Sequence, residues 1–373
     1  MFNKFRERVS HINPRAEISK FASSPRVSRL QIQLNQKKHK VNQFIQANKT
    51  ALMISALIIS VIVFYFVVFF RRVPRFLKRM DREYKHRCQI SSIQYNKKIM
   101  DGNYRLCDFY IASSYKSYLP CTNYYDYACK EAIKKSLYYG ARHIDLDIMP
   151  KGFSNCDDLV ICNGQSRGNW HYTTSIPLDE TLEMISKYAF STKVPNGSDP
   201  LFITLNMKTW NNKQAYEKCA VLIKKYFINK LLPLEFGFQG RHSRVNISTS
   251  PIKKLLDKVV FICNDDVIDT GLDEIVNISS KNYGNMRLVT YKEVENCKDI
   301  TEFRDFNKKF MTQVVPSFEE RMKSNFNYLL PYYLGCQFIC MNYTEPDKWM
   351  KLYVETFKEY SFVLKPYKLR TSK

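Results

Sequence analysis

The sequence predicts an α/β protein, a (β/α)8 barrel of the TIM type, preceded by a single transmembrane helix. Two observations carry this prediction. Residues 51–70 form an apolar run without a charged residue. Residues 101–370 alternate short apolar runs with longer segments of helical periodicity. That alternation is typical of βα units around a parallel sheet, and eight such units over roughly 250 residues form a closed barrel.

The apolar run Ala51 to Phe70 is long enough to cross a membrane. Its twenty residues would extend about 30 Å as a helix, which matches the hydrocarbon core of a bilayer. A buried core helix of this length would normally carry a polar face. A cleaved signal peptide is also a poor interpretation, because the run is too long and begins fifty residues into the chain.

The formal charge of +23 at pH 7 is concentrated beside the apolar run. Residues 1–50 hold eleven Lys and Arg against two acidic residues, and residues 71–88 hold eight against two. Basic residues next to a span are attracted to anionic headgroups by about 1 kcal/mol each. The charge therefore favours a bilayer as the partner, and no motif indicates a nucleic acid.

Two signals disagree about which side of the membrane the C-terminal domain occupies. Four Lys precede the run within about twenty residues and eight Lys and Arg follow it, so the positive-inside rule places the domain in the cytoplasm. All eleven cysteines lie after the run, a density that would suit disulfides in an oxidising compartment. We expect a single-pass protein with a cytoplasmic C-terminal domain.

Four segments follow from these patterns. Residues 1–50 are predicted to be a basic, disordered arm, because Pro14 and Pro25 interrupt any long helix. Residues 51–70 are the span, residues 71–100 a basic juxtamembrane segment, and residues 101–370 the barrel.

Within the barrel, the sequence predicts eight strands and five helices. The predicted strands are Phe109–Ser113, His143–Ile148, Leu159–Cys162, Leu201–Asn206, Val259–Cys263, Met286–Thr290, Gln337–Asn342 and Phe362–Leu364. The predicted helices are Tyr124–Tyr139, Leu178–Phe190, Asn212–Phe227, Asn325–Leu334 and Asp347–Tyr360.

The ends of the first four predicted strands carry polar motifs, and in such barrels the reactive groups lie at the carboxyl ends of strands. The motifs read IASSYKSYLP, GARHIDLDIMP, LVICNG and PLFITLNMK. Together they resemble the X region of phosphoinositide-specific phospholipase C. Residues 303–342 and FVLKP at 362–366 resemble the Y region of that family. The resemblance divides the barrel into an X-like part (105–263), a connecting region (264–300) and a Y-like part (301–370).

The resemblance implies a phosphodiester-cleaving site with two histidines, one acting as general base and one protonating the leaving group. Carried over by position, the first histidine falls on Tyr115 and the second on Asn163. A tyrosine is a poor base near neutral pH, and an asparagine cannot transfer a proton. Because each positioned acid or base contributes about 10²- to 10⁴-fold, we expect the family reaction to be absent.

The same resemblance implies a calcium ion held by an Asn, two acidic residues and a Glu. The Asn falls on Lys116 and the Glu on Asn206, so only Asp145 and Asp147 remain. These two side chains share one face of a strand. They could still bind Ca²⁺, or they could be a polar strand end satisfied by Lys116 or Lys208. Apart from this calcium ion, no cofactor is predicted.

Three functions are compatible with this pattern. The first is a non-enzymatic scaffold that binds a phosphoinositide headgroup, another anionic lipid or a protein partner, with cations supplied by Lys116, Arg167, Lys208 and Lys323. The second is a phosphoric diester hydrolase with a rearranged site, in which His171, in the loop GQSRGNWHYTT, replaces the missing acid and a lysine, Lys116 or Lys208, replaces the metal. The third is a structural membrane protein of a virus, since the chain is similar to degenerate phospholipase-C-like proteins of large DNA viruses.

Overall fold

The computed structural model describes residues 25–120, 127–152, 158–166, 170–210, 212–237, 246–282, 284–317 and 324–371. The chain divides into two compact units, one ending at Arg71 and the other comprising Arg72–Lys373.

The first unit is helical in its described part. Helix α3 covers Pro25–Ala47 and α4 covers Lys49–Phe70. The prediction of a disordered arm is therefore wrong for residues 25–47. Pro25 begins α3 instead of interrupting a helix, and the first turn tolerates proline because its N–H would have no partner there. Pro14 lies outside the described residues.

One helix in the described part of the chain is long and apolar enough to cross a membrane. It runs from Lys49 to Tyr84, and its apolar portion is α4. Leu57, Ile58 and Ile59 are 65%, 53% and 60% exposed. Successive helical residues point about 100° apart, so α4 exposes apolar side chains on all sides.

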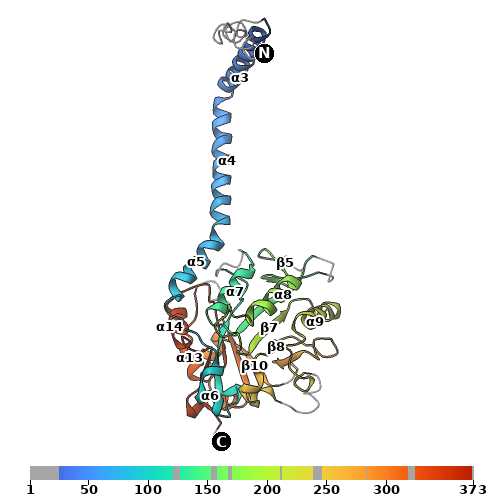
Figure 1. Cartoon of the computed structure of the whole chain (residues 1–373), viewed down its shortest axis with the longest axis vertical. Coiled ribbons are helices and arrows are strands. Elements are labelled where there is room, and N and C mark those ends of the chain that lie inside the picture. Colours follow the sequence, from blue (N-terminus) through green and yellow to red (C-terminus); the bar gives the residue numbers. More distant parts are fainter. Residues whose placement is uncertain are drawn as a thin grey trace, which may run out of the picture. The chain divides into compact units, whose positions relative to one another are not determined.

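The second unit is built on eight parallel strands (Figure 1). The sheet order is β10-β11-β12-β1-β2-β7-β8-β9, and β9 also contacts β10, which brings the two edges together. The (β/α)8 architecture is as predicted. The strands are β1 (Phe109–Ser114), β2 (His143–Pro150), β7 (Leu201–Met207), β8 (Val259–Cys263), β9 (Val276–Ser279), β10 (Met286–Thr290), β11 (Met311–Val315) and β12 (Phe338–Met341).

Two predicted strands exist but do not belong to the parallel barrel. β3 (Leu159–Ile161) pairs antiparallel with the end of β2, and β13 (Phe362–Leu364) pairs antiparallel with β1. The parallel set is completed by β9 and β11, which the sequence analysis missed. β9 lies in the predicted connecting region, which is therefore part of the barrel wall.

Short strands and long helices complete the unit. Near the end of β2 lie β4 (Gly164–Gln165), β5 (Trp170–His171) and β6 (Ile176–Pro177). Predicted helix boundaries were close for α8 (Leu178–Ala189) and α9 (Lys213–Phe227), whereas α13 (Leu329–Tyr333) is shorter than predicted and α12 (Ile300–Asn307) was not predicted. The helices that cover the outside are α7 (Lys130–Tyr138), α8 (Leu178–Ala189), α9 (Lys213–Phe227), α11 (Tyr291–Glu295), α12 (Ile300–Asn307), α13 (Leu329–Tyr333) and α14 (Lys348–Thr356).

Helix α5 (Arg72–Tyr84) belongs to the barrel and not to a separate juxtamembrane segment. Met80 and Tyr84 are fully buried, and Leu77 packs against the same core cluster. These positions recur at i, i+3 and i+7, which places them on one helical face. The basic residues of the segment occupy the other face. The predicted domain boundary at residue 101 therefore moves to residue 72.

We expect Met80→Ala to destabilise the barrel, because it removes a fully buried side chain. The free energy of unfolding should fall by about 2–4 kcal/mol. Urea denaturation of the full chain in detergent measures this change. Lys78→Ala, on the exposed face of the same helix, is the matched control and should change stability by less than about 0.5 kcal/mol. Equal effects of the two variants would contradict the docked position of α5.

Candidate functional site

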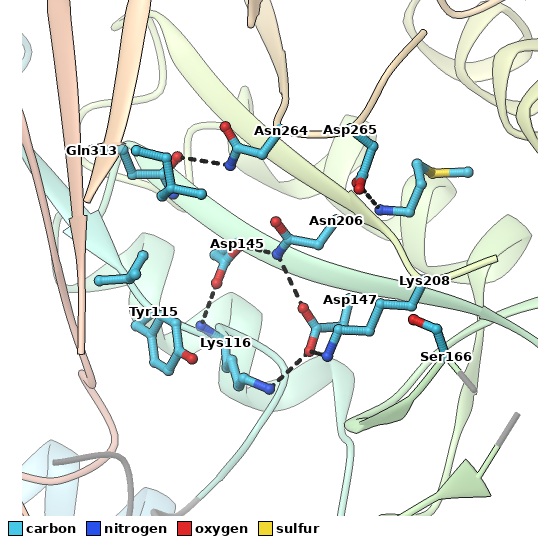
Figure 2. A pocket seen from close by; sticks show the side chains of 13 residues that line it. Tyr115, Lys116, Asp145, Asp147, Ser166, Asn206, Lys208, Asn264, Asp265 and Gln313 are labelled. Carbon is cyan, nitrogen blue, oxygen red and sulfur yellow. Dashed lines mark hydrogen bonds and ion pairs between the residues drawn. The ribbon is translucent and has the colours of Figure 1, made fainter. Parts of the chain in front are cut away.

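A cavity of about 320 Å³ opens at the carboxyl ends of the barrel strands. Its walls come from β1, β2, β7, β8, β10 and β11 and from the loops that follow these strands (Figure 2). The lining is polar: it holds two lysines, three aspartates and several amides. The lining residues are Tyr115, Lys116, Asp145, Asp147, Ser166, Asn206, Met207, Lys208, Asn264, Asp265, Leu288, Gln313 and Val315.

Lys116 follows β1 in a left-handed backbone conformation, with φ of 39°. This conformation costs a non-glycine residue roughly 1–2 kcal/mol. Three hydrogen bonds hold Lys116 in place. The backbone N–H of Lys116 donates to Oδ2 of Asp145 at 3.1 Å. Its Nζ donates to Oδ2 of Asp147 at 2.8 Å and to Oδ1 of Asn163 at 2.5 Å. The side chain is only 6% exposed, so the ammonium is held inside the protein.

Asp147 is the centre of this arrangement. Its Oδ2 accepts from Nζ of Lys116, from Nζ of Lys208 at 2.7 Å and from the hydroxyl of Tyr118 at 2.9 Å. Lys208 also donates to the carbonyl of Gly164 at 3.2 Å. Asp147 is 2% exposed. A buried carboxylate requires such compensation, because an unpaired charge inside a protein costs several kcal/mol.

Asn206 joins the two acids. Its Nδ2 donates to Oδ1 of Asp145 at 2.6 Å and to Oδ1 of Asp147 at 3.0 Å. Strand pairing explains the geometry, since β2 and β7 are parallel and place Asp147 directly opposite Asn206. We call the five residues Lys116, Asp145, Asp147, Asn206 and Lys208 the lysine–aspartate network.

The two aspartates have opposite pKa shifts. Burial opposes ionisation of Asp147, but the ammonium groups of Lys116 and Lys208 outweigh it and hold the pKa of Asp147 below its usual range. Burial and the neighbouring Asp147 charge raise the pKa of Asp145 to about 6. Burial also lowers the pKa of Lys116, against the attraction of Asp147. The network therefore neutralises its own charges.

The residues present do not fit a calcium ion. Calcium takes six to eight oxygen ligands, whereas the oxygens of Asp145 and Asp147 already accept from two ammonium groups, an amide and a hydroxyl. Among the described residues, no group of three or more His, Cys, Asp or Glu could hold a metal ion. Of the two interpretations of this acidic pair, the geometry favours the strand end satisfied by lysines.

Tyr115 and Asn163, the positions on which the resemblance places the two histidines, both lie at the site. Tyr115 lines the cavity, and its ring lies 5.8 Å from Nζ of Lys116. Asn163 is buried and accepts from Lys116. Neither side chain can act as an acid or base near neutral pH.

His171, the residue predicted to replace the missing acid, lies outside the cavity lining. Nε2 of His171 lies 2.8 Å from the carbonyl oxygen of Pro150. His143 is fully buried beneath the site, and burial lowers its pKa to about 3. Arg167 and Lys323, two of the cations predicted for ligand binding, lie outside the described residues.

Four polar residues of the site were missed by the sequence analysis. Tyr118 lies in the quoted motif IASSYKSYLP but was given no role. Asp265 accepts from the backbone N–H of Met207 at 2.7 Å. Asn264 donates to Gln313 at 3.2 Å across the barrel. Asp265 and Asn264 directly follow the predicted strand Val259–Cys263, so the strand-end rule could have found them. Gln313 could have been found only if β11 had been predicted as a strand.

The fold and the site together define a phosphodiesterase-type barrel whose acidic strand end is occupied by lysines. Comparison with family models agrees with this class. The model of the phosphatidylinositol-specific phospholipase C X domain matches residues 103–261, and the Y-domain model matches residues 266–368. The chain therefore belongs to the phosphatidylinositol-specific phospholipase C family.

Individual relatives extend the comparison. The chain is 24% identical over 328 residues to human inactive phospholipase C-like protein 1, a match that covers 75% of this chain and 28% of that protein. The crystal structures of L. pealei PLC21 and S. officinalis PLC21 each superpose with a TM-score of 0.59 at 17% identity, covering 72% of this chain and 38% of theirs. The chain thus spans less than half of each relative, and the structural likeness shows the fold.

Lys116→Met should destabilise the barrel by about 3 kcal/mol, because it removes one of the charges that compensate the buried Asp147. Lys208→Met should lower the free energy of unfolding by less, since the side chain of Lys208 is 26% exposed. Urea denaturation of the full chain measures both. Lys213→Met, at an exposed position, is the control. If Lys116→Met left the free energy of unfolding unchanged, the network would contribute little to the stability of the barrel.

The raised pKa of Asp145 predicts a pH dependence of stability. The ordinary value is 3.8 and the folded value about 6, so between these pH values the folded chain keeps a proton that the unfolded chain has lost. The resulting stabilisation is present below pH 4 and is lost as the pH rises to 6. Its amplitude is roughly 3 kcal/mol. Asp145→Asn should abolish this part of the stability profile, measured by denaturation at several pH values, whereas Asp158→Asn, at an exposed site, should leave it unchanged.

Proposed function

We propose that this chain is a non-hydrolytic, phospholipase-C-like scaffold anchored to a membrane by α4. The observation that carries the proposal is the lysine–aspartate network, which fills the strand-end position with protein cations. A phosphodiesterase of this family would also need a proton-transfer pair there, and Tyr115 and Asn163 do not supply one. The human relative whose name calls it inactive is consistent with this interpretation.

The anchor is supported by the composition and exposure of α4. Its 22 residues extend about 33 Å, enough for a hydrocarbon core. None of its most apolar stretch is buried within the structure. An apolar helix exposed on all sides is costly in water, and a bilayer would cover it.

A cytoplasmic position of the barrel is supported by its thiols and by the basic residues that follow α4. The nine cysteines in the described part of the chain are all free. Burial raises the pKa of Cys219 and of Cys336 to about 12 each. Unpaired, protonated thiols fit a reducing compartment better than an oxidising one. Both the free thiols and the basic residues thus support a cytoplasmic barrel.

The proposal also concerns which ligand the scaffold binds and where. Lys116 and Lys208 are engaged by Asp147, which leaves them poorly suited to bind a phosphate inside the cavity. Anionic lipid recognition is better assigned to the exposed basic side chains of α5, such as Arg75 and Lys78. The cavity itself would admit a small polar group of a lipid or partner.

The absence of hydrolysis can be tested with the full chain reconstituted in vesicles. These vesicles contain phosphatidylinositol and its bisphosphate. We expect no release of inositol phosphates with or without calcium, because the described site offers no proton-transfer pair. Calcium should also leave the thermal unfolding midpoint unchanged. Calcium-dependent hydrolysis would overturn the proposal. If hydrolysis occurs without calcium, its loss in His171→Ala would identify the rearranged site as the correct alternative.

A further inference from the structure

A second cavity, of about 330 Å³, lies on the outer wall of the barrel between α5 and α7. The two helices are neighbours at this point (Figure 1). Among the described residues, none lines both this cavity and the strand-end cavity, so the two are separate. We call it the α5–α7 cavity. Its lining residues are Asp81, Lys85, Cys88, Ile90, Lys135, Tyr138, Tyr139 and Pro195.

Hydrogen bonds join the two helices at the wall of the α5–α7 cavity. Oδ1 of Asp81, on α5, accepts from Nζ of Lys135 at 2.5 Å and from the hydroxyl of Tyr139 at 2.7 Å. The ring of Tyr139 packs edge-on against the buried ring of Tyr84, with 5.3 Å between the ring centroids. These contacts do not need a ligand, so the wall is already formed in the folded barrel.

The floor of the α5–α7 cavity is apolar and is held by backbone hydrogen bonds. The N–H groups of Gln89 and Ser91 donate to carbonyls of the segment after α14, at 2.9 and 2.8 Å. Between them, Ile90 is 9% exposed. Burial raises the pKa of Cys88 to about 12, so its thiol stays neutral and behaves as a small apolar group. A ligand in this cavity would therefore need an apolar body.

The rim of the α5–α7 cavity carries one uncompensated positive charge. Lys135 and Asp81 neutralise each other through their ion pair. Lys85, one helical turn after Asp81, is exposed and makes no ion pair within the described part of the chain. Beside these charges, the ring of Tyr138 is 44% exposed. A lysine binds a carboxylate through a charge-assisted hydrogen bond, and a tyrosine ring packs well against another ring.

We propose that the α5–α7 cavity binds a small aromatic carboxylate, whose ring packs against Tyr138 and Ile90 and whose carboxylate is held by Lys85. The volume of the cavity lies at the low end of the range of about 300–1,000 Å³ for small-molecule pockets. The inference goes beyond the proposed scaffold, because the site uses neither the strand-end cavity nor α4. A ligand that touches both α5 and α7 would also stabilise the docked position of α5 by mass action.

Calorimetric titration with 2-naphthoate tests this site. The full chain is placed in nanodiscs of zwitterionic lipid, and the heat measured with empty nanodiscs is subtracted. We expect one-to-one binding that Lys85→Met weakens roughly tenfold, because a charged hydrogen bond is lost. Tyr138→Ala should weaken binding several-fold. The neutral analogue 2-naphthamide should bind about as weakly to the wild-type chain as 2-naphthoate binds to Lys85→Met.

Matched controls come from exposed side chains elsewhere on the barrel. Lys213→Met, on α9, and Tyr367→Ala, on the 3-10 helix Tyr367–Leu369, should bind 2-naphthoate as the wild-type chain does. An unchanged unfolding midpoint of Lys85→Met and Tyr138→Ala would show that both variants fold. One-to-one binding that is absent from the wild-type chain, or that is equal in Lys85→Met, would overturn the proposal.

The position of the ligand can be tested independently through the thiols. Cys88 lines the α5–α7 cavity and is partly exposed, and Cys129 and Cys297 are the other partly exposed cysteines in the described part of the chain. Saturating 2-naphthoate should slow the alkylation of Cys88 by N-ethylmaleimide several-fold, as measured by peptide mass spectrometry. Cys129 and Cys297 should react at unchanged rates. Equal rates at Cys88 with and without 2-naphthoate would contradict binding in this cavity.

Discussion

The buried carboxylate of Asp147 is the constraint on which the cavity depends. A charge that is 2% exposed must be compensated from within the protein, and Lys116 and Lys208 supply that compensation from the ends of two different strands. The requirement explains the left-handed backbone at Lys116, and the paired amide of Asn206 follows from it as well. The cavity therefore holds polar side chains that pair with one another at the ends of β1, β2 and β7.

Much of the fold could be predicted because the apolar pattern of the strands is strong. Val259–Cys263 and Met286–Thr290 were predicted with their observed boundaries. β9 and β11 were missed because Asn277, Thr312 and Gln313 interrupt their apolar runs, and these polar side chains find hydrogen-bond partners inside the structure. β3 and β13 show the opposite error: periodicity identifies a strand but not the direction of its partner.

The site could be predicted only in part, for a related reason. The spacing of Asp145 and Asp147 placed both on one face of a strand, and Lys116 and Lys208 were recognised as alternative partners. The sequence could not show that both lysines reach the same oxygen of Asp147, because that depends on how β1, β2 and β7 are aligned in the sheet. The docking of α5 was visible as spacing at Leu77, Met80 and Tyr84, but the basic residues between them suggested a membrane segment instead.

The central claim is that ammonium groups of the protein occupy the place where a relative would bind a divalent cation. A crystal structure of the protein grown with millimolar calcium tests it most directly. The account predicts density for Nζ of Lys116 between Asp147 and Asn163, with Nζ of Lys208 on the same carboxylate and no ion bound to Asp145 or Asp147. A calcium ion coordinated by these two aspartates, with Lys116 displaced, would contradict it.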